Sequence, residues 1–357
     1  MLAIGLMSGT SLDGVDSSLI ETDGENYFKE LFNFHIPYPL EFQTKLRKLI
    51  DTKQDWFELE QELTNYHAIC VLELLNKAKV NSNEITVSGF PGQTIYHNPT
   101  RGITWQIGNP HLLAKLTNID VVSDFRRRDV VYGGQGAPLV PIFHKCLMKD
   151  EQMPVAILNI GGVANITYID NSNLIAFDTG PGNALINDAI LKHYNKTYDD
   201  QGIIASSGKV NSKLIEQILA DDFFKKLPPK SLDRNHFIKH NELLTINNPQ
   251  DLVATLTKLT ASSISIAIRL LPKIPSKIYL CGGGCKNITL LEWLREENKH
   301  IGVEFTDITS LGLDPDFIEA QAFAYLAIRF LKMLPSSFPS TTSVSQETLS
   351  GVLFPSS

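Results

Sequence analysis

Ile4-Gly5-Leu6-Met7-Ser8-Gly9-Thr10-Ser11-Leu12-Asp13-Gly14-Val15-Asp16, near the start of the chain, says more about the fold than any other stretch. It begins as a short apolar strand that runs into a glycine and hydroxyl turn. Glycine lets the backbone approach a ligand closely, and the hydroxyl and amide groups suit phosphate oxygens. Asp13 and Asp16 add carboxylates that could face a hydrated magnesium ion. The stretch therefore predicts a strand–turn–strand hairpin at a phosphate site.

Two later segments repeat this plan of an apolar strand followed by a glycine turn. They are Asn159-Ile160-Gly161-Gly162-Val163-Ala164-Asn165 and Cys281-Gly282-Gly283-Gly284-Cys285-Lys286-Asn287. One such turn is also compatible with a tight hairpin that binds nothing, but three together suggest a nucleotide held between two lobes. No turn has P-loop spacing, and no Gly-x-Gly-x-x-Gly opens a helix early in the chain, which disfavours P-loop kinases and Rossmann enzymes.

Composition indicates an ordinary globular protein of 357 residues, with 43% hydrophobic residues, 20% charged residues and a net charge of −7. The acidic balance argues against a nucleic-acid surface. We expect no targeting segment and no window approaching the roughly 18 apolar residues of a membrane span. The cysteines lack zinc spacing, which favours reduced thiols in a cytoplasmic protein.

Strand and helix signals alternate in both halves of the chain, each half beginning with a strand–turn–strand pattern. Apolar residues recur every three or four positions over Trp56–Leu75, and Asp251–Leu271 and Phe317–Leu334 are also predicted to be helical. We expect an N-terminal lobe over residues 1–130, completed by the Ser/Thr/Pro-rich tail 336–357, and a C-terminal lobe over residues 131–335. The tail itself is predicted to be irregular.

Asp178 is the best catalytic candidate, within Phe177-Asp178-Thr179-Gly180-Pro181-Gly182-Asn183. A carboxylate at the end of an apolar strand projects from the sheet edge where α/β folds bind ligands. Sugar-kinase chemistry needs one carboxylate close to the accepting oxygen. The same side chain would equally suit a cap on the following helix or turn.

Three arginines stand between two aspartates in Asp124-Phe125-Arg126-Arg127-Arg128-Asp129. Arginine binds carboxylates in a bidentate manner, so one of the three is a candidate for holding an acidic substrate. An ion-pair network within the protein would use the same residues. Glu319, at the start of the last predicted helix, either faces the cleft or is a solvated glutamate favoured by the helix dipole.

These motifs together resemble the anhydro-N-acetylmuramic acid kinases of bacteria, from residue 4 to about Phe330. The resemblance is carried by the hairpin over residues 5–16, the arginine run, Gly133-Gly134-Gln135-Gly136-Ala137-Pro138-Leu139-Val140-Pro141, Asn159–Gly162, Asp178–Asn183 and Cys281–Gly284. It implies the actin/Hsp70/sugar-kinase fold, an α/β architecture with a duplicated mixed sheet flanked by helices and a ligand cleft between two lobes.

The resemblance also implies a reaction that uses ATP and Mg²⁺. Water opens the 1,6-anhydro ring of 1,6-anhydro-N-acetylmuramic acid while O6 takes the γ-phosphate, in recycling of cell-wall sugar. Asp178 would be the base that activates the water. Metal ligands stay unknown, with Mg²⁺ expected mainly on the ATP phosphates. ATP would be bound by Gly9, Thr10, Ser11, Leu12, Asp13, Gly14, Val15, Asp16, Gly161, Gly162, Gly282, Gly283 and Gly284, and the sugar by Gln93, Arg128, Asp129, Gln135 and Glu319.

The sequence departs from the family pattern at two places. Pro91 stands where a histidine usually precedes Gly-Gln-Thr, and Leu232-Asp233 stands where Thr-Gly is common. The alternatives are therefore a kinase for another amino sugar or a non-catalytic ATP-binding module on the same fold. The expected partner is a small sugar rather than nucleic acid or a membrane, and the family suggests a homodimer.

Overall fold

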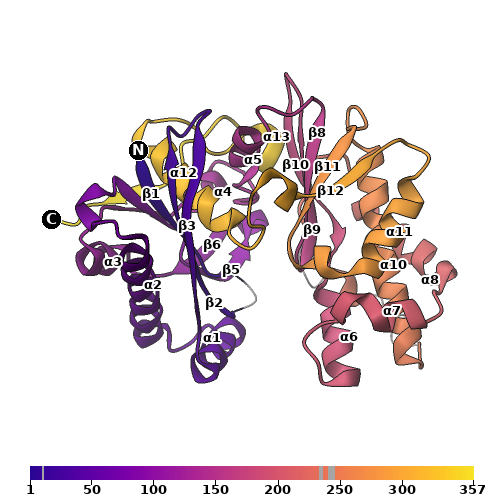
Figure 1. Ribbon diagram of the computed structural model, residues 1–357. Coiled ribbons are helices and arrows are strands. Elements are labelled where there is room, and N and C mark those ends of the chain that lie inside the picture. Colours follow the sequence, from indigo (N-terminus) through magenta and orange to yellow (C-terminus); the bar gives the residue numbers. More distant parts are fainter. Residues whose placement is uncertain (10–11, 233–235, 240–245) are drawn as a thin grey trace. The chain divides into compact units, whose positions relative to one another are not determined.

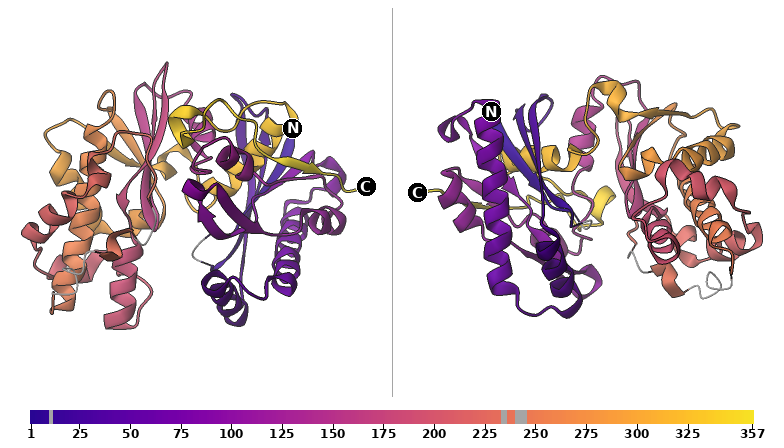
Figure 2. Two further views of the ribbon diagram at one scale, coloured as in Figure 1. Left: turned by 180° about the vertical axis from the view of Figure 1, so that it is seen from behind. Right: turned by 60° about the horizontal axis from the view of Figure 1, so that its bottom comes forward.

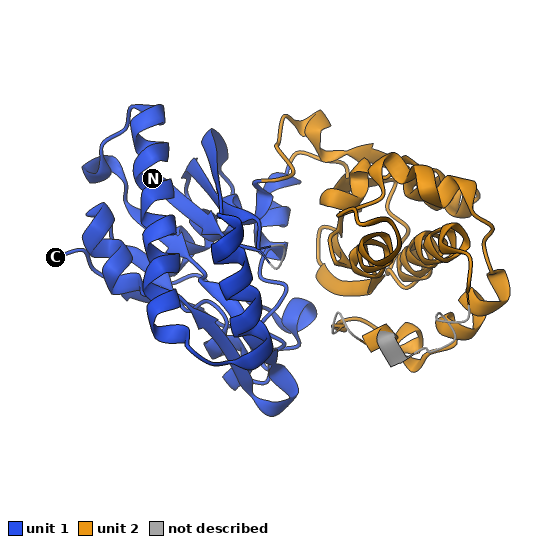
Figure 3. Cartoon of the chain, turned by 90° about the horizontal axis from the view of Figure 1, so that it is seen from below, with its two compact units in different colours: residues 1–149, 317–357 blue, residues 150–316 orange. Residues whose placement is uncertain are grey.

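The computed structural model describes residues 1–9, 12–232, 236–239 and 246–357. The chain folds into two compact units, shown in Figure 3. Unit 1 comprises residues 1–149 and 317–357, and unit 2 comprises residues 150–316.

This division differs from the predicted domain boundaries. Residues 131–149 and 317–335 belong to unit 1, whereas the sequence predicts both stretches in the second lobe. The physical reason lies in the helix over Ile318–Leu331, which packs against the strands of the first sheet. The chain therefore returns to unit 1 before its tail begins.

Unit 1 consists of one six-stranded mixed sheet, a two-stranded sheet and surrounding helices (Figure 1). Its elements are β1 (Leu2–Met7), β2 (Gly14–Thr22), β3 (Phe28–Pro37), α1 (Leu40–Thr52), α2 (Trp56–Ala78), β4 (Val87–Phe90), β5 (Gln93–Asn98), β6 (Ile103–Ile107), α3 (Pro110–Thr117), β7 (Val121–Ser123), α4 (Arg127–Val131), α5 (Pro141–Leu147), α12 (Ile318–Leu331), α13 (Pro339–Thr342) and β13 (Val352–Phe354).

The two faces of the large sheet in unit 1 are covered by different helices. Side chains alternate along a strand, so Ile4 and Leu6 of β1 share one face, where they join the core formed with α2. Gly5 faces the other way, and a Cβ there would lie 1.8 Å from the Ala320 carbonyl oxygen of α12. A Cβ at Gly89 of β4 would similarly lie 2.1 Å from the Phe323 carbonyl oxygen. These two glycines let α12 pack directly on the strands.

Unit 2 consists of a five-stranded mixed sheet and helices (Figure 1). Its elements are β8 (Val155–Ile160), β9 (Val163–Ile169), β10 (Leu174–Pro181), α6 (Ala184–Tyr194), α7 (Ile203–Ser207), α8 (Ser212–Leu219), α9 (Asp222–Lys225), α10 (Pro249–Arg269), β11 (Lys277–Cys281), α11 (Ile288–Asn298) and β12 (Glu304–Asp307).

The two large sheets share one topology. Unit 1 has the order β3-β2-β1-β4-β7, extended by β13, and unit 2 has the order β10-β9-β8-β11-β12. In each sheet the first three strands of the unit pair antiparallel, and two later strands add parallel to the first. The predicted α/β fold with a duplicated mixed sheet is confirmed. Within each unit, the carboxyl ends of the parallel strands lie at the same edge of that unit's sheet, so the turns that follow these strands lie close together.

Helix α10 corrects one expectation. The sequence pattern predicts no stretch close to a membrane span, but α10 is long and apolar enough to cross a membrane by length and composition alone. In its most apolar stretch of 18 residues, 72% is buried inside the protein. The reason is that α10 packs against β10 and against α6, α7 and α8. A helix that is apolar all round is expected in such a central position, so its composition reflects the core of unit 2.

The tail contributes a strand rather than remaining wholly irregular. β13 pairs antiparallel with β7 at the edge of the unit 1 sheet. Phe354 lies edge-on to the His111 ring of α3, with ring centroids 4.9 Å apart. In Figure 2 the yellow end of the chain accordingly lies beside the sheet of unit 1.

Candidate functional site

In unit 2, three predicted features converge at one sheet edge. The turn after β8 contains Gly161 and Gly162, and the turn after β11 contains Gly282–Gly284. Because β8 and β11 are parallel, both turns lie at the same edge. The end of β10 joins them, since the Asn183 amide N–H donates to the Gly161 carbonyl over 2.8 Å and its side chain donates to the Ile160 carbonyl over 3.2 Å.

The glycines at this edge fall into two groups. A Cβ added to Gly161, Gly162 or Gly283 would meet no heavy atom closer than 3.6 Å, and Gly162 and Gly283 are exposed. A Cβ on Gly182 would lie 2.2 Å from the Gly161 carbonyl oxygen, and one on Gly284 2.3 Å from the Ile160 side chain. Internal packing therefore requires glycine at 182 and 284. It does not require glycine at 161, 162 and 283, where the bare backbone lets a ligand approach closely.

Asp178 stands near the end of β10, where the register with β9 shifts. Its amide N–H donates to the Lys230 carbonyl over 2.9 Å, and its Oδ2 accepts the Leu232 amide N–H over 2.7 Å. Burial raises the pKa of Asp178 to about 7, and the Leu232 hydrogen bond lowers it, offsetting part of that rise. The side chain does not cap α6, because that helix has no side-chain cap. A carboxyl group with this pKa can exchange protons near neutral pH.

Lys230 was not singled out by the sequence analysis. Only 8% of the residue is exposed, and its ammonium donates to the Phe223 carbonyl over 3.1 Å. Burial lowers the pKa of Lys230 to about 8, and neighbouring Lys226 adds to the effect. A lysine within a proline-containing loop carries no sequence signal for burial, which is why the pattern did not point to it.

In unit 1, the first phosphate turn follows β1, and its residues Thr10 and Ser11 lie outside the described part of the chain. Leu12 and Val15 bury their side chains in the core, so only their backbone is available to a ligand. Asp13 is exposed, whereas Asp16 accepts from His35 Nδ1 over 2.7 Å. Gly14 is needed for packing, because a Cβ there would lie 2.3 Å from the Ile36 carbonyl oxygen.

Gln93, the first residue of β5, connects this turn to the two-stranded sheet of unit 1. It is 1% exposed, and its Nε2 donates to the Gly9 carbonyl over 3.3 Å. Its Oε1 is buried and has no hydrogen-bond partner among the described residues. Gln93, a predicted sugar-site residue, therefore contacts Gly9 of the predicted ATP-binding turn directly.

Asp129 and Gln135 lie where the 134–136 turn meets the tail. Asp129 is fully buried, and its carboxylate accepts the Gly136 amide N–H over 2.5 Å and the Thr342 hydroxyl over 2.6 Å. The Gln135 amide N–H donates to the Thr342 carbonyl over 2.6 Å. Asp129 thus ties two segments of unit 1 together, while its predicted contact with a substrate stays a prediction.

The three arginines of the run have different surroundings. Arg127 pairs with Asp124 over 3.6 Å, and exposed Arg128 donates to the Leu349 carbonyl over 3.2 Å. Arg126 is half-buried, its Nη1 donates to the Gly136 carbonyl over 2.7 Å, and its Nε is buried with no hydrogen-bond partner in the described part of the chain.

Arg126 also lies within electrostatic reach of Glu319. Glu319 itself is exposed at the start of α12. The protein atoms around its carboxylate still raise its pKa by desolvation, the charge of Arg126 offsets part of that rise, and Asp16 adds to it. Desolvation in turn lowers the pKa of Arg126, which Glu319 and Asp129 counteract. The structure therefore brings Arg126 within electrostatic reach of the start of α12, while the substrate contact predicted for Arg128 stays a prediction. The order of the three arginines in the run does not show which side chain turns inward, so the sequence does not distinguish them.

Metal ligands do not cluster in the described residues, where no group of three histidine, cysteine, aspartate or glutamate side chains could hold an ion. None of the four cysteines, all within the described residues, forms a disulfide. A hollow of about 450 Å³ lies beside the Asp178 contacts and is lined by Ala220, Asp221, Asp222, Phe223, Lys226, Ser231, Leu232 and His236.

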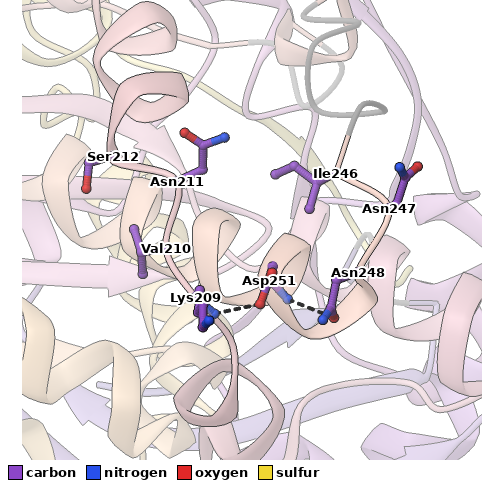
Figure 4. A pocket seen from close by; sticks show the side chains of 8 residues that line it. All are labelled: Lys209, Val210, Asn211, Ser212, Ile246, Asn247, Asn248 and Asp251. Carbon is purple, nitrogen blue, oxygen red and sulfur yellow. Dashed lines mark hydrogen bonds between the residues drawn. The ribbon is translucent and has the colours of Figure 1, made fainter.

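A larger hollow of about 620 Å³ lies elsewhere in unit 2, at the N-terminal ends of α8 and α10 (Figure 4). It is lined by Lys209, Val210, Asn211, Ser212, Ile246, Asn247, Asn248 and Asp251. Protein groups already use its polar atoms, since Asp251 accepts the Lys209 amide N–H over 2.7 Å and Asn248 accepts the Gln250 amide N–H over 2.9 Å. The Asn248 contact caps α10, and the Asn211 side chain caps α8 by accepting the Leu214 amide N–H over 3.1 Å.

Comparisons with known proteins cover almost the whole chain. The family model described as anhydro-N-acetylmuramic acid kinase matches residues 1–356. A protein of that name from Zymomonas mobilis is 43% identical, covering 96% of this chain and 97% of its own length. One from Rhodopseudomonas palustris strain HaA2 is 42% identical, covering 99% of both chains.

Solved structures are more distant. Component A of (R)-2-hydroxyglutaryl-CoA dehydratase from Acidaminococcus fermentans covers 92% of this chain and 98% of its own, with 14% identity and a TM-score of 0.48. A ROK hexokinase from Thermus thermophilus covers 92% of this chain and all of its own, with 14% identity and a TM-score of 0.41.

Proposed function

The chain belongs to the anhydro-N-acetylmuramic acid kinase family, and from this we propose that it converts 1,6-anhydro-N-acetylmuramic acid and ATP to N-acetylmuramic acid 6-phosphate and ADP. Water attacks the anomeric carbon, the bond between C1 and O6 breaks, and O6 takes the γ-phosphoryl group. The water oxygen remains on C1. Ring opening and phosphoryl transfer thus form one reaction.

The observation that carries this proposal is the environment of Asp178. A general base works best when its pKa lies near the operating pH, and burial raises the pKa of Asp178 to about 7. At pH 7.5 a large share of these carboxylates is ionised and able to take a proton from water. The hydrogen bond from Leu232 to Oδ2 fixes one oxygen and leaves Oδ1 for the water.

The glycine turns support ATP as the phosphate donor. Gly161, Gly162 and Gly283 leave open backbone at one edge of the unit 2 sheet. Gly282 and Gly284, together with the unit 1 turn over residues 9–16, complete the proposed ATP-binding set. A Mg²⁺ ion carried by the ATP phosphates would neutralise charge that develops during phosphoryl transfer. Asp13 and Asp16 are the carboxylates of that turn.

Unit 1 contains the residues that are proposed to contact the sugar. The substrate carries a lactyl carboxylate, and Arg126 is a half-buried cation within electrostatic reach of Glu319. We assign the carboxylate contact to Arg126 in preference to Arg128. Gln93, Gln135 and Glu319 are proposed to contact the sugar, and Asp129 is proposed to hold the turn that presents Gln135.

The family places this activity in sugar metabolism, and we propose that the protein acts in the cytoplasm in peptidoglycan recycling and amino-sugar catabolism. We also propose a homodimer that needs neither nucleic acid nor a membrane. Membership of a kinase family disfavours the non-catalytic ATP-binding module considered from sequence.

The proposed function is tested by measuring ADP release with a panel of sugars. The panel contains the anhydro sugar, N-acetylmuramic acid, N-acetylglucosamine and glucose. We expect ADP release to require the anhydro sugar, and mass spectrometry to identify a 6-phosphate product. Equal rates with any panel member, or ADP release independent of sugar, would contradict the assignment.

A further inference from the structure

The segment Lys230–Leu232 holds Asp178 at two points. The Asp178 main chain donates to the Lys230 carbonyl over 2.9 Å, and its side chain accepts from the Leu232 amide over 2.7 Å. The first contact fixes the backbone of Asp178 and the second fixes the orientation of its carboxylate. Any movement of this segment would therefore move or free the carboxylate.

The Lys230 side chain attaches this segment to the body of unit 2. Its ammonium donates to the Phe223 carbonyl over 3.1 Å and lies 4.6 Å from the centroid of the Phe223 ring. The Phe177 ring, next to Asp178 in β10, is 5.9 Å away. No carboxylate of the described residues forms an ion pair with it. Burying a lysine away from water has a cost, which this hydrogen bond and the two ring faces offset.

The attachment point is itself fixed. Asp221 accepts the Phe223 amide N–H over 2.8 Å and so caps the short helix α9. Phe223 is 4% exposed and packs edge-on against Phe224, with centroids 5.3 Å apart. A continuous set of contacts therefore runs from α9 through Lys230 to Asp178. The neighbouring lysines, Lys225 and Lys226, are exposed and take no part in it.

We propose that Lys230 is a positioning residue for Asp178: its buried ammonium anchors segment 230–232, which orients the carboxylate for proton transfer. This inference rests on the proposed function for its catalytic consequence. The contacts that carry it lie entirely within unit 2. Lys230 acts through the main chain and does not touch the reacting atoms.

The test compares Lys230→Met with Lys226→Met. Both changes remove a lysine charge from residues 226–230, but only the first removes the buried anchor of segment 230–232. With the anhydro sugar and ATP, Lys230→Met should lower kcat about tenfold or more and leave the KM for the sugar within about twofold. Lys226→Met should keep wild-type values. Equal kcat in Lys230→Met and wild type, or a loss confined to KM, would overturn the proposal.

A carboxyl ¹³C NMR titration tests the positioning without turnover, with the Asp178 signal identified by its loss in Asp178→Asn. Burial is the larger influence on the Asp178 pKa, so a loosened segment that admits water should lower the midpoint by about half a pH unit or more. An unchanged or raised midpoint would overturn the inference. If wild type shows no sugar-dependent turnover, the proposed function fails while this titration still decides the role of Lys230. Should Lys230→Met not fold, Lys230→Gln serves in both measurements.

Discussion

Replacing Asp178 by asparagine separates a catalytic carboxylate from a structural one. In the folded protein burial raises the pKa of Asp178 to about 7, against 3.8 for an unperturbed aspartate. A raised folded pKa stabilises the protein below the unfolded value, and this stabilisation is lost as pH rises through 7. Ionised Asp178 therefore opposes folding at alkaline pH, whereas an asparagine of similar shape does not.

The size of this effect follows from the two pKa values. Between pH 5.5 and pH 8, proton linkage gives a relative loss of about 2 kcal/mol for the wild type, and partial solvent access reduces it to about 1–2 kcal/mol. Urea unfolding at the two pH values measures it. Between pH 5.5 and pH 8, the free energy of unfolding of Asp178→Asn should rise by this amount relative to wild type. The exposed control Asp222→Asn should show no such rise.

Turnover of the same variant should fall about a hundredfold or more if Asp178 is the base. The wild-type kcat/KM should decline about tenfold per unit below pH 7, as the carboxylate becomes protonated. A variant that keeps near-wild-type turnover, or a stability difference that is constant with pH, would refute the reasoning.

Three further outcomes are expected. Gly161→Ala and Gly162→Ala place their Cβ at ordinary van der Waals distance, 3.6 Å or more, from the nearest heavy atoms. They should therefore keep the wild-type melting temperature and raise the KM for ATP about tenfold. Calorimetry and kinetics check this against Gly182→Ala, whose Cβ would lie 2.2 Å from a carbonyl oxygen and which should cost about 2 kcal/mol or more of stability. Arg126→Met should lower kcat/KM for the sugar about 10- to 100-fold, and Arg128→Met less than about threefold; similar losses in both would contradict the assignment. Asp129→Ala should lower the free energy of unfolding by about 2–4 kcal/mol in urea titrations, and a value near zero would exclude its role in holding the tail.

Much of the fold could be read from strand order and turn chemistry. The hairpin around Gly9 and its repeat around Gly161 are local features, because an apolar strand and a glycine turn are encoded by neighbouring residues. Within unit 2, the meeting of the Gly161 turn with the Gly282–Gly284 turn follows from the parallel pairing of β8 and β11. The position of Asp178 at the end of β10 was predictable for the same reason.

Features set by distant contacts could not be read in this way. Helix α12 is apolar on most sides, so its sequence does not show which sheet it covers, and the domain boundary was misplaced there. Arg126 is oriented by the Gly136 carbonyl across a turn, and no spacing rule distinguishes it from Arg128. Lys230 is buried by Phe223, which belongs to a different local element.

The reaction in ¹⁸O-labelled water tests the central claim most directly. Product formed from unlabelled ATP and anhydro sugar is analysed by fragment mass spectrometry, with N-acetylmuramic acid 6-phosphate incubated alone as a control for exchange at C1. Attack by water on the anomeric carbon places one ¹⁸O on C1 and leaves the phosphate unlabelled. Label in the phosphate group, or an unlabelled C1 oxygen, would contradict the account.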